Sequence, residues 1–159
     1  TEESNVDALY LVDSFGALYS EQITHLAKKY KSLMPTKEIG IHAHNNQQLA
    51  FANTIEAVIQ NVNFLDGTIF GIGRAAGNCP LELLLGFLKN PKYDLRPILE
   101  ILESHFVKLK EEIEWGYTIP YMITGILDLH PRAGMKLRKS DNRDNYLGFF
   151  DGLVESDSA

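Results

Sequence analysis

The stretch Ile39-Gly40-Ile41-His42-Ala43-His44-Asn45-Asn46 decides how this sequence of 159 residues is interpreted. Side chains of different character alternate over residues 38–44, which predicts a β-strand with two distinct faces. One face would carry Ile39, Ile41 and Ala43, and the other Gly40, His42 and His44. Two histidines at positions i and i+2 of a strand leave the same face, so their imidazoles could hold one metal ion. The alternative is a pair of strand-end histidines that are hydrogen-bonded to the next loop.

Strand and helix signals alternate on both sides of this stretch. Strands are predicted over 8–12, 38–44 and 62–70, and helices over 20–34, 47–60 and 80–89. The first strand is wholly apolar, as expected when both faces of a parallel strand are buried. Ser20 is the expected N-cap of the first helix. The second helix offers five apolar side chains for its buried face: Leu49, Ala52, Ile55, Val58 and Ile59.

The order of these elements predicts an α/β fold. Strands that alternate with helices favour a parallel sheet with right-handed crossovers. About three such units are too few to close an eight-stranded TIM (β/α)8 barrel. Residues 1–90 are therefore expected to form part of a barrel. The sequence has no initiator methionine and reaches its first strand at residue 8, so we expect a piece of a longer protein.

Residues 91–159 are predicted to be a small all-helical segment. An amphipathic stripe runs over 95–113, a second apolar segment covers 117–129, and His130-Pro131 breaks it. A last helix is predicted over 141–153, followed by a frayed end at 155–159.

Composition excludes several classes of protein. The net charge is −6 and no run rich in Lys or Arg occurs, so a nucleic-acid surface is not expected. No apolar run approaches the ~20 residues of a membrane span, and no signal peptide opens the sequence. The single cysteine, Cys79, excludes an internal disulfide and fits a reducing compartment, so the cytoplasm is the expected location.

Two further loops could contribute to a site at the strand ends. In the glycine-rich loop over 71–78, Gly71 and Gly73 would let the backbone approach a ligand closely. Asn78 could cap the following helix, or its amide oxygen could bind a hard cation. After the first strand, Asp13 and Ser14 could hold a substrate carboxylate, or Asp13 could stabilise a turn. If the strands are neighbours, the three strand ends converge on one pocket.

The sequence resembles the metal-dependent barrel enzymes that include 4-hydroxy-2-oxovalerate aldolase, isopropylmalate synthase and hydroxymethylglutaryl-CoA lyase. The matching pieces are Val12-Asp13-Ser14-Phe15-Gly16, Gly40-Ile41-His42-Ala43-His44-Asn45-Asn46 and Gly71-Ile72-Gly73-Arg74-Ala75-Ala76-Gly77-Asn78. They look like the sixth, seventh and eighth barrel strands. Ala76-Gly77-Asn78-Cys79-Pro80-Leu81-Glu82 is most similar to the aldolase branch, and the helical segment resembles the small helical domain of bacterial aldolases.

The resemblance implies roles for particular residues. His42 and His44 would be metal ligands, with Asn78 as a further ligand or a group beside them. Ser14 would contact the substrate carboxylate. A tyrosine after the barrel takes part in the aldolase reaction, and Tyr117 and Tyr121 are the catalytic candidates. For each one taken singly, aromatic packing on a helix is the favoured alternative. Cys79 does not match the catalytic cysteine of the lyase branch and is expected to be a small buried residue.

The implied chemistry is cleavage or formation of a carbon–carbon bond beside a small 2-oxo acid, with Mn²⁺ or Mg²⁺ as the ion. The family places a metal-binding Asp and a catalytic Arg on its first strand, which this sequence lacks. Asp66 is no substitute, since it is predicted near the beginning of its strand. We therefore expect the chain alone to bind metal weakly and to be inactive.

Exposed sheet edges predict a homo-oligomer or association with the missing N-terminal part. Two alternatives remain: an acyl-CoA condensing synthase or lyase of the same superfamily, and a non-catalytic assembly module.

Overall fold

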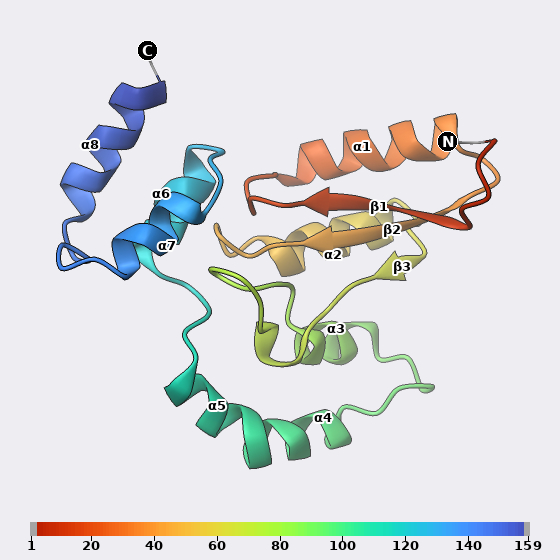
Figure 1. Cartoon of the computed structure of the whole chain (residues 1–159). Helices are drawn as coiled ribbons and strands as arrows, with labels where there is room; N and C mark the ends of the chain where they lie inside the picture. The colour runs from red at the N-terminus through yellow and green to blue at the C-terminus, as the bar shows by residue number, and fades with distance from the viewer. Residues whose placement is uncertain (1–2, 158–159) are drawn as a thin grey trace.

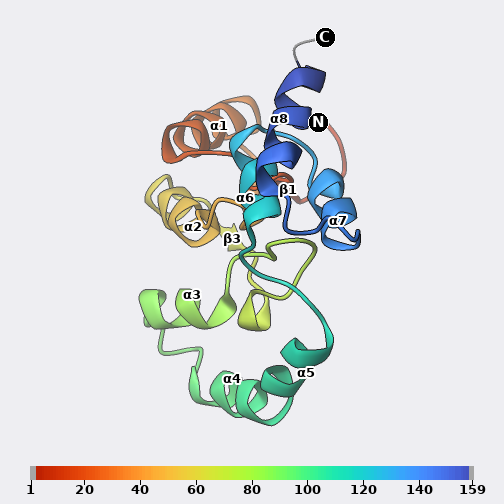
Figure 2. The same cartoon turned by 90° about the vertical axis from the view of Figure 1, so that its left-hand side faces the viewer.

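A parallel three-stranded sheet lies at the centre of the computed structural model, which describes residues 3–157. Strands β1 (Ala8–Asp13), β2 (Glu38–Ala43) and β3 (Phe64–Leu65) lie in the order β1-β2-β3. Leu11 pairs with Ile41, and Ile41 pairs with Leu65 on its other side. Helices α1 (Ser20–Leu33), α2 (Ala50–Ile59) and α3 (Leu81–Leu88) are stacked along one side of the sheet (Figures 1 and 2). The predicted α/β fold with a parallel sheet is confirmed.

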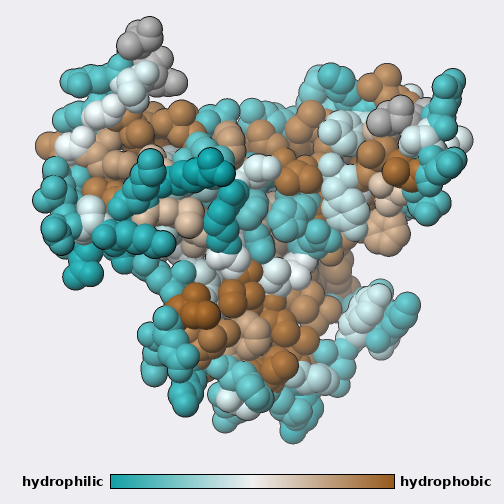
Figure 3. Space-filling view, viewed as in Figure 1, coloured by the Kyte–Doolittle hydropathy of each residue, from teal (hydrophilic) through white to brown (hydrophobic). Residues whose placement is uncertain are grey.

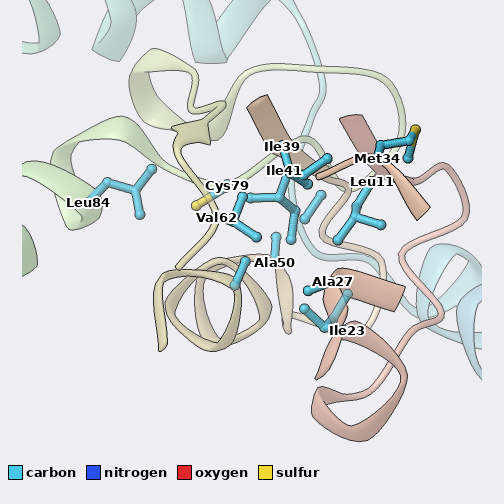
Figure 4. Packing of buried hydrophobic residues seen from close by; sticks show 12 residues of the cluster. Leu11, Ile23, Ala27, Met34, Ile39, Ile41, Ala50, Val62, Cys79 and Leu84 are labelled. Atoms are coloured by element: carbon cyan, nitrogen blue, oxygen red, sulfur yellow. The ribbon is translucent and has the colours of Figure 1, made fainter. Parts of the chain in front are cut away.

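The hydrophobic core lies between the sheet and these helices. Figure 4 shows side chains from β1 and β2 beside those of α1 and α2. The face of β2 that carries Ile39, Ile41 and Ala43 is the one that packs into this core, and all three residues are almost completely buried. The core also includes Leu11, Ile23, Ala27, Met34, Ala50, Ala57, Val62, Cys79 and Leu84.

The predicted buried face of the helix over 47–60 is wrong. The structure buries Ala50, Asn53, Thr54 and Ala57, whereas Ile59 is 63% exposed. The two polar residues can be buried because their donors are used within the fold. The Thr54 hydroxyl donates to the Ala50 carbonyl at 2.7 Å, and Asn53 Nδ2 donates to the Leu18 carbonyl at 2.8 Å. Hydrogen bonding thus outweighs the apolar pattern here.

The other side of the sheet is open among the residues that the structure describes. Tyr10, Val12 and Phe64 are 36%, 53% and 46% exposed, and the Tyr10 and Phe64 rings stack with their centroids 6.4 Å apart. The expectation that both faces of the first strand are buried is therefore wrong for this chain. An apolar strand requires a cover on each face, and the described residues supply a cover for only one.

The third strand is much shorter than predicted. Instead of a strand over 62–70, β3 ends at Leu65 and a 3₁₀ turn, η1 (Ile69–Gly71), follows. Phe70 has a φ of +56° inside that turn, which is incompatible with an extended strand. The segment 66–68 therefore belongs to a loop at the carboxyl end of the sheet.

The second half of the chain is helical. It contains α4 (Arg96–Ile101), a π-helical stretch η2 (Leu102–Phe106), α5 (Val107–Glu112), α6 (Ile119–Ile126), α7 (Arg132–Arg138) and α8 (Tyr146–Asp157). Helix α7 was not predicted, and α8 begins and ends later than expected. Figure 1 shows α6 and α7 beyond the carboxyl ends of β1 and β2. No helix of the described residues is long and apolar enough to cross a lipid bilayer.

The helices over 96–112 bury none of their described side chains, although the sequence has an apolar stripe there. Leu99 and Val107 are 51% and 56% exposed. Hydrophobic residues accordingly gather on the lower part of the molecule, where α4 and α5 lie (Figure 3). A groove of about 700 Å³ opens between α3 and α4, beside Leu88 and Ile98. The amphipathic pattern thus marks a surface rather than a core.

The Cys79 thiol should be unreactive in the folded chain. Cys79 is fully buried, as expected, and burial raises the pKa of its thiol to about 11 from 9.0. Because the thiolate is the reactive form, its population is lowered about 100-fold. Iodoacetamide at pH 8 should therefore label the native chain very slowly and the urea-unfolded chain rapidly, as followed by mass spectrometry. Equal rates in the two states would contradict this prediction.

Candidate metal and substrate site

His42 and His44 lie together at the carboxyl end of β2. Their ring centroids are 5.2 Å apart with an interplanar angle of 82°. His44 follows the last residue of the strand and pairs with Asn78 through an isolated antiparallel bridge. Burial, then the neighbouring His42 and Arg74, lower the pKa of His44. His44 is therefore neutral at neutral pH, which is the form that metal coordination requires.

Asp66 belongs to this group of side chains, contrary to expectation. Its Oδ2 lies 3.1 Å from Nδ1 of His42. The sequence placed Asp66 near the beginning of a long strand, but β3 ends at Leu65, so Asp66 stands at the carboxyl end. A carboxylate at Nδ1 fixes the ring orientation of a histidine and directs Nε2 toward a ligand. The signal that could have found it is the strand-ending sequence Leu65-Asp66-Gly67-Thr68.

Asn78, whose backbone pairs with His44, carries a side-chain oxygen without a partner among the described residues. Its Nδ2 donates to the Ile72 carbonyl at 3.1 Å, whereas its Oδ1 is buried and accepts no hydrogen bond from the described residues. Asn78 does not cap α3, because Pro80 occupies the N-cap position. A buried acceptor without a donor is costly, and a bound cation would satisfy it.

The glycines of the 71–78 loop make room for the backbone and for Asn78. A Cβ on Gly73 would lie 2.6 Å from Nδ2 of Asn78. Gly71 has a φ of +59°, and its carbonyl accepts the Asn78 amide at 3.0 Å. These two glycines are thus required by the loop itself, and a direct contact with substrate remains a prediction.

Asp13, the last residue of β1, and Ser14, which follows it, have different environments. The Asp13 carboxylate is buried and accepts hydrogen bonds from the amides of Ala17 at 3.0 Å and Leu18 at 3.2 Å. Burial raises its pKa, against these hydrogen bonds. Such contacts match the turn-stabilising alternative. Ser14 is exposed, and its carbonyl accepts a hydrogen bond from Arg74 Nη2 at 3.0 Å.

The two candidate tyrosines lie in different environments. Tyr117 is 53% exposed just before α6, whereas Tyr121 is 6% exposed within it. Tyr121 packs against Ala75 and Ala76 of the glycine-rich loop, and burial raises its pKa. Tyr121 thus has the packing role that the sequence left open, and the catalytic role of either tyrosine remains a prediction.

Arg74 and His130 were not assigned a role from the sequence. Arg74 Nη1 lies 3.3 Å from Nε2 of His130, which follows α6. Gln47 fixes α6 to the strand ends, because its Nε2 donates to the carbonyls of Ala17 and Gly125, both at 3.2 Å. The arginine within an otherwise small-residue loop was the one available signal.

The donors at this end of the sheet fit a divalent cation. Two imidazoles and one amide oxygen, from His42, His44 and Asn78, provide mixed nitrogen and oxygen ligands. The described residues contain no group of three or more His, Cys, Asp or Glu side chains that could hold an ion. Water or further groups would have to complete the coordination, and weak binding remains a prediction.

Comparison with known proteins identifies the family. Residues 1–104 match the family described as HMGL-like, and the chain belongs to that family. It is 38% identical over 155 residues to a 4-hydroxy-2-oxovalerate aldolase of Geobacillus thermodenitrificans, covering 90% of this chain and 44% of that protein. It is also 38% identical over 84 residues to an oxaloacetate decarboxylase of Mycobacterium tuberculosis, covering 53% of this chain and 25% of that protein.

A solved structure supports the same assignment. The N-terminal domain of a candidate aldolase from Bacteroides vulgatus superimposes with a TM-score of 0.74 at 32% identity. The match covers 86% of this chain and 46% of that one. The chain thus spans less than half the length of each of these proteins.

Proposed function

We propose that this chain forms part of a divalent-metal-dependent aldolase that cleaves or forms a carbon–carbon bond beside a 2-oxo acid. The observation that carries this proposal is the unpartnered side-chain oxygen of Asn78, the residue whose backbone pairs with His44 of the His42–His44 pair. The aldolases among its relatives support the reaction class. In this proposal, residues 1–90 are the last three strands of a barrel and residues 91–159 are its helical extension.

The residues of the chain would act as follows. His42, His44 and Asn78 hold the ion, and Asp66 orients the His42 ring through their 3.1 Å contact. When bound, Mn²⁺ or Mg²⁺ supplies a Lewis acid that stabilises negative charge on the keto oxygen. Ser14 lies at the exposed end of β1, where it can face the substrate.

Decarboxylation is a second candidate that one relative favours. The Mycobacterium tuberculosis relative is named oxaloacetate decarboxylase. Loss of the C4 carboxylate of oxaloacetate as carbon dioxide and aldol cleavage both leave negative charge on the carbon next to the keto group, so one metal site could serve either reaction. Condensation of an acyl-CoA and a non-catalytic assembly role are the remaining alternatives.

Enzyme assays of the full-length protein distinguish these alternatives directly. Purified with Mn²⁺, it should cleave 4-hydroxy-2-oxovalerate, and a chelator should abolish the reaction. Release of carbon dioxide from oxaloacetate without aldol cleavage would favour the decarboxylase. If condensation of acetyl-CoA with a 2-oxo acid is the only activity observed, a condensing synthase is favoured. Absence of all three reactions in metal-loaded protein would reject the enzymatic proposal.

The open face of the sheet should make this chain associate. Val12 and Phe64 expose apolar side chains on a sheet whose β1 and β3 have unpaired edges within the described residues. Burying such a face is favourable at about 25 cal/mol per Å². Light scattering should therefore show a homo-oligomer, and Val12→Lys should shift it toward the monomer. A stable monomer of the unaltered chain would contradict the predicted association.

We also propose a cytoplasmic location, because a reducing compartment suits the free thiol of Cys79.

A further inference from the structure

Arg74 connects three loops that meet beyond the strand ends. It belongs to the glycine-rich loop, donates to the Ser14 carbonyl after β1 at 3.0 Å, and reaches Nε2 of His130 at 3.3 Å. Its side chain is nonetheless exposed, so a small molecule can reach the guanidinium. A guanidinium group carries five N–H donors. The Ser14 carbonyl accepts a hydrogen bond from one of them, on Nη2. The remaining donors of Arg74 are therefore available for a ligand.

The roles of the two atoms in the contact between Arg74 and His130 depend on which nitrogen of the His130 ring carries the hydrogen. The backbone amide of Arg132 lies 3.1 Å from Nδ1 of His130, closer than Arg74 Nη1 lies to Nε2 at 3.3 Å, so we assign Nδ1 as the acceptor of this ring. A neutral imidazole accepts at one nitrogen and carries its hydrogen on the other. Burial, and then the charges of Arg74 and Arg132, lower the pKa of His130 and keep the ring neutral. Its hydrogen is consequently on Nε2, the atom that faces Arg74.

Two N–H donors, Nη1 of Arg74 and Nε2 of His130, therefore face each other. Donors in this arrangement have no mutual attraction, but both can donate to an anionic oxygen placed beside them. We propose that Arg74 and His130 form an anion subsite that binds the carboxylate of the 2-oxo acid. The choice of a 2-oxo acid rests on the proposed function, whereas the anion subsite itself rests on these donors.

The position of the subsite agrees with this ligand. Ser14, Arg74 and Asn78 belong to the loops that flank the His42–His44 pair. Arg74 lies four residues before Asn78, whose backbone pairs with His44. A carboxylate held by Arg74 would thus place the adjacent keto group on the side of the histidines. Arginine suits this task because its planar, permanently charged fork matches a carboxylate.

Titration of the chain with pyruvate, monitored by NMR, tests the subsite without metal. EDTA is present throughout, and the neutral analogue pyruvamide is titrated in parallel. Pyruvate should shift the Arg74 and His130 side-chain resonances. Arg74→Gln should weaken pyruvate binding about 10-fold or more, because it removes a charged hydrogen bond. Arg96→Gln is the matched control: Arg96 is exposed and pairs with Glu100 on α4, so pyruvate binding should be unchanged.

His130 is tested with a pair of variants. His130→Leu removes the Nε2 donor and should weaken pyruvate binding about 5-fold, whereas His130→Gln keeps an N–H donor and should retain most of the affinity. If Arg74 only ties the loops together, Arg74→Gln will weaken pyruvamide as much as pyruvate, and the proposal is overturned. Equal binding of pyruvate by the Arg74→Gln and Arg96→Gln variants also overturns it.

Inorganic phosphate separates a substrate subsite from a general anion site. If phosphate binds as tightly as pyruvate and shows the same loss in Arg74→Gln, the assignment to a carboxylate is wrong. Since no metal is present, a failed metal site would leave the pyruvate result intact. Conversely, loss of the pyruvate result would leave metal binding by His42 and His44 unaffected.

Discussion

Replacing His42 and His44 together by alanine should lower the affinity for Mn²⁺ about 100-fold or more. The two imidazoles are the nitrogen ligands of the proposed site, and the Asn78 oxygen alone cannot retain an ion against water. Asp66→Asn should have a smaller effect, about 10-fold, because Asp66 contacts the His42 ring rather than the ion. Electron paramagnetic resonance of free Mn²⁺ during titration gives each affinity.

The control for this experiment is the double variant His25→Ala plus His105→Ala. These two histidines are exposed on α1 and η2 and lie outside the proposed site. Their removal should leave Mn²⁺ affinity unchanged, although the number of histidines lost is the same. If the His42–His44 variant retains its affinity, or both double variants lose it equally, the metal site is elsewhere.

Replacing Gly77 by alanine should destabilise the chain by about 3 kcal/mol or more. Gly77 has a φ of +82°, and a Cβ there would lie 2.0 Å from the Gly71 carbonyl oxygen. That oxygen is backbone and accepts the Asn78 amide at 3.0 Å, so it cannot move without breaking the loop. The Gly77 carbonyl also accepts the Asn45 amide at 2.9 Å, so the displacement would reach the segment after His44.

Urea unfolding followed by circular dichroism measures this loss. Gly152→Ala is the matched control, since Gly152 lies in α8 and an added Cβ would meet nothing within 4 Å. That variant should be stabilised by about 0.5–1 kcal/mol, because alanine is the better helix former. An unfolded or insoluble Gly77→Ala protein agrees with the expected loss. Similar unfolding midpoints for the two variants would contradict the argument.

Local patterns were sufficient to predict much of the sheet and of the histidine pair. The alternation around Ile41 predicted which residues of β2 share a face, because the period of two is a property of the extended backbone itself. The same reasoning failed for α2, where small and hydrogen-bonded residues such as Thr54 are buried in place of Ile59. Apolar spacing is therefore an incomplete guide to burial, because a polar side chain whose hydrogen bonds are made within the fold can be buried as well.

The sequence by itself determined the parallel α/β order, the common face of His42 and His44, and the family. Each of these depends on residues that are near one another in the chain. Tertiary structure decided the position of Asp66, which the sequence only hints at, because the end of β3 is set by its pairing with β2 at Ile41. It also decided the meeting of Arg74 with Ser14 and His130, which are 60 and 56 residues away. Such contacts depend on how separate loops pack against one another, and a local sequence pattern does not predict this packing.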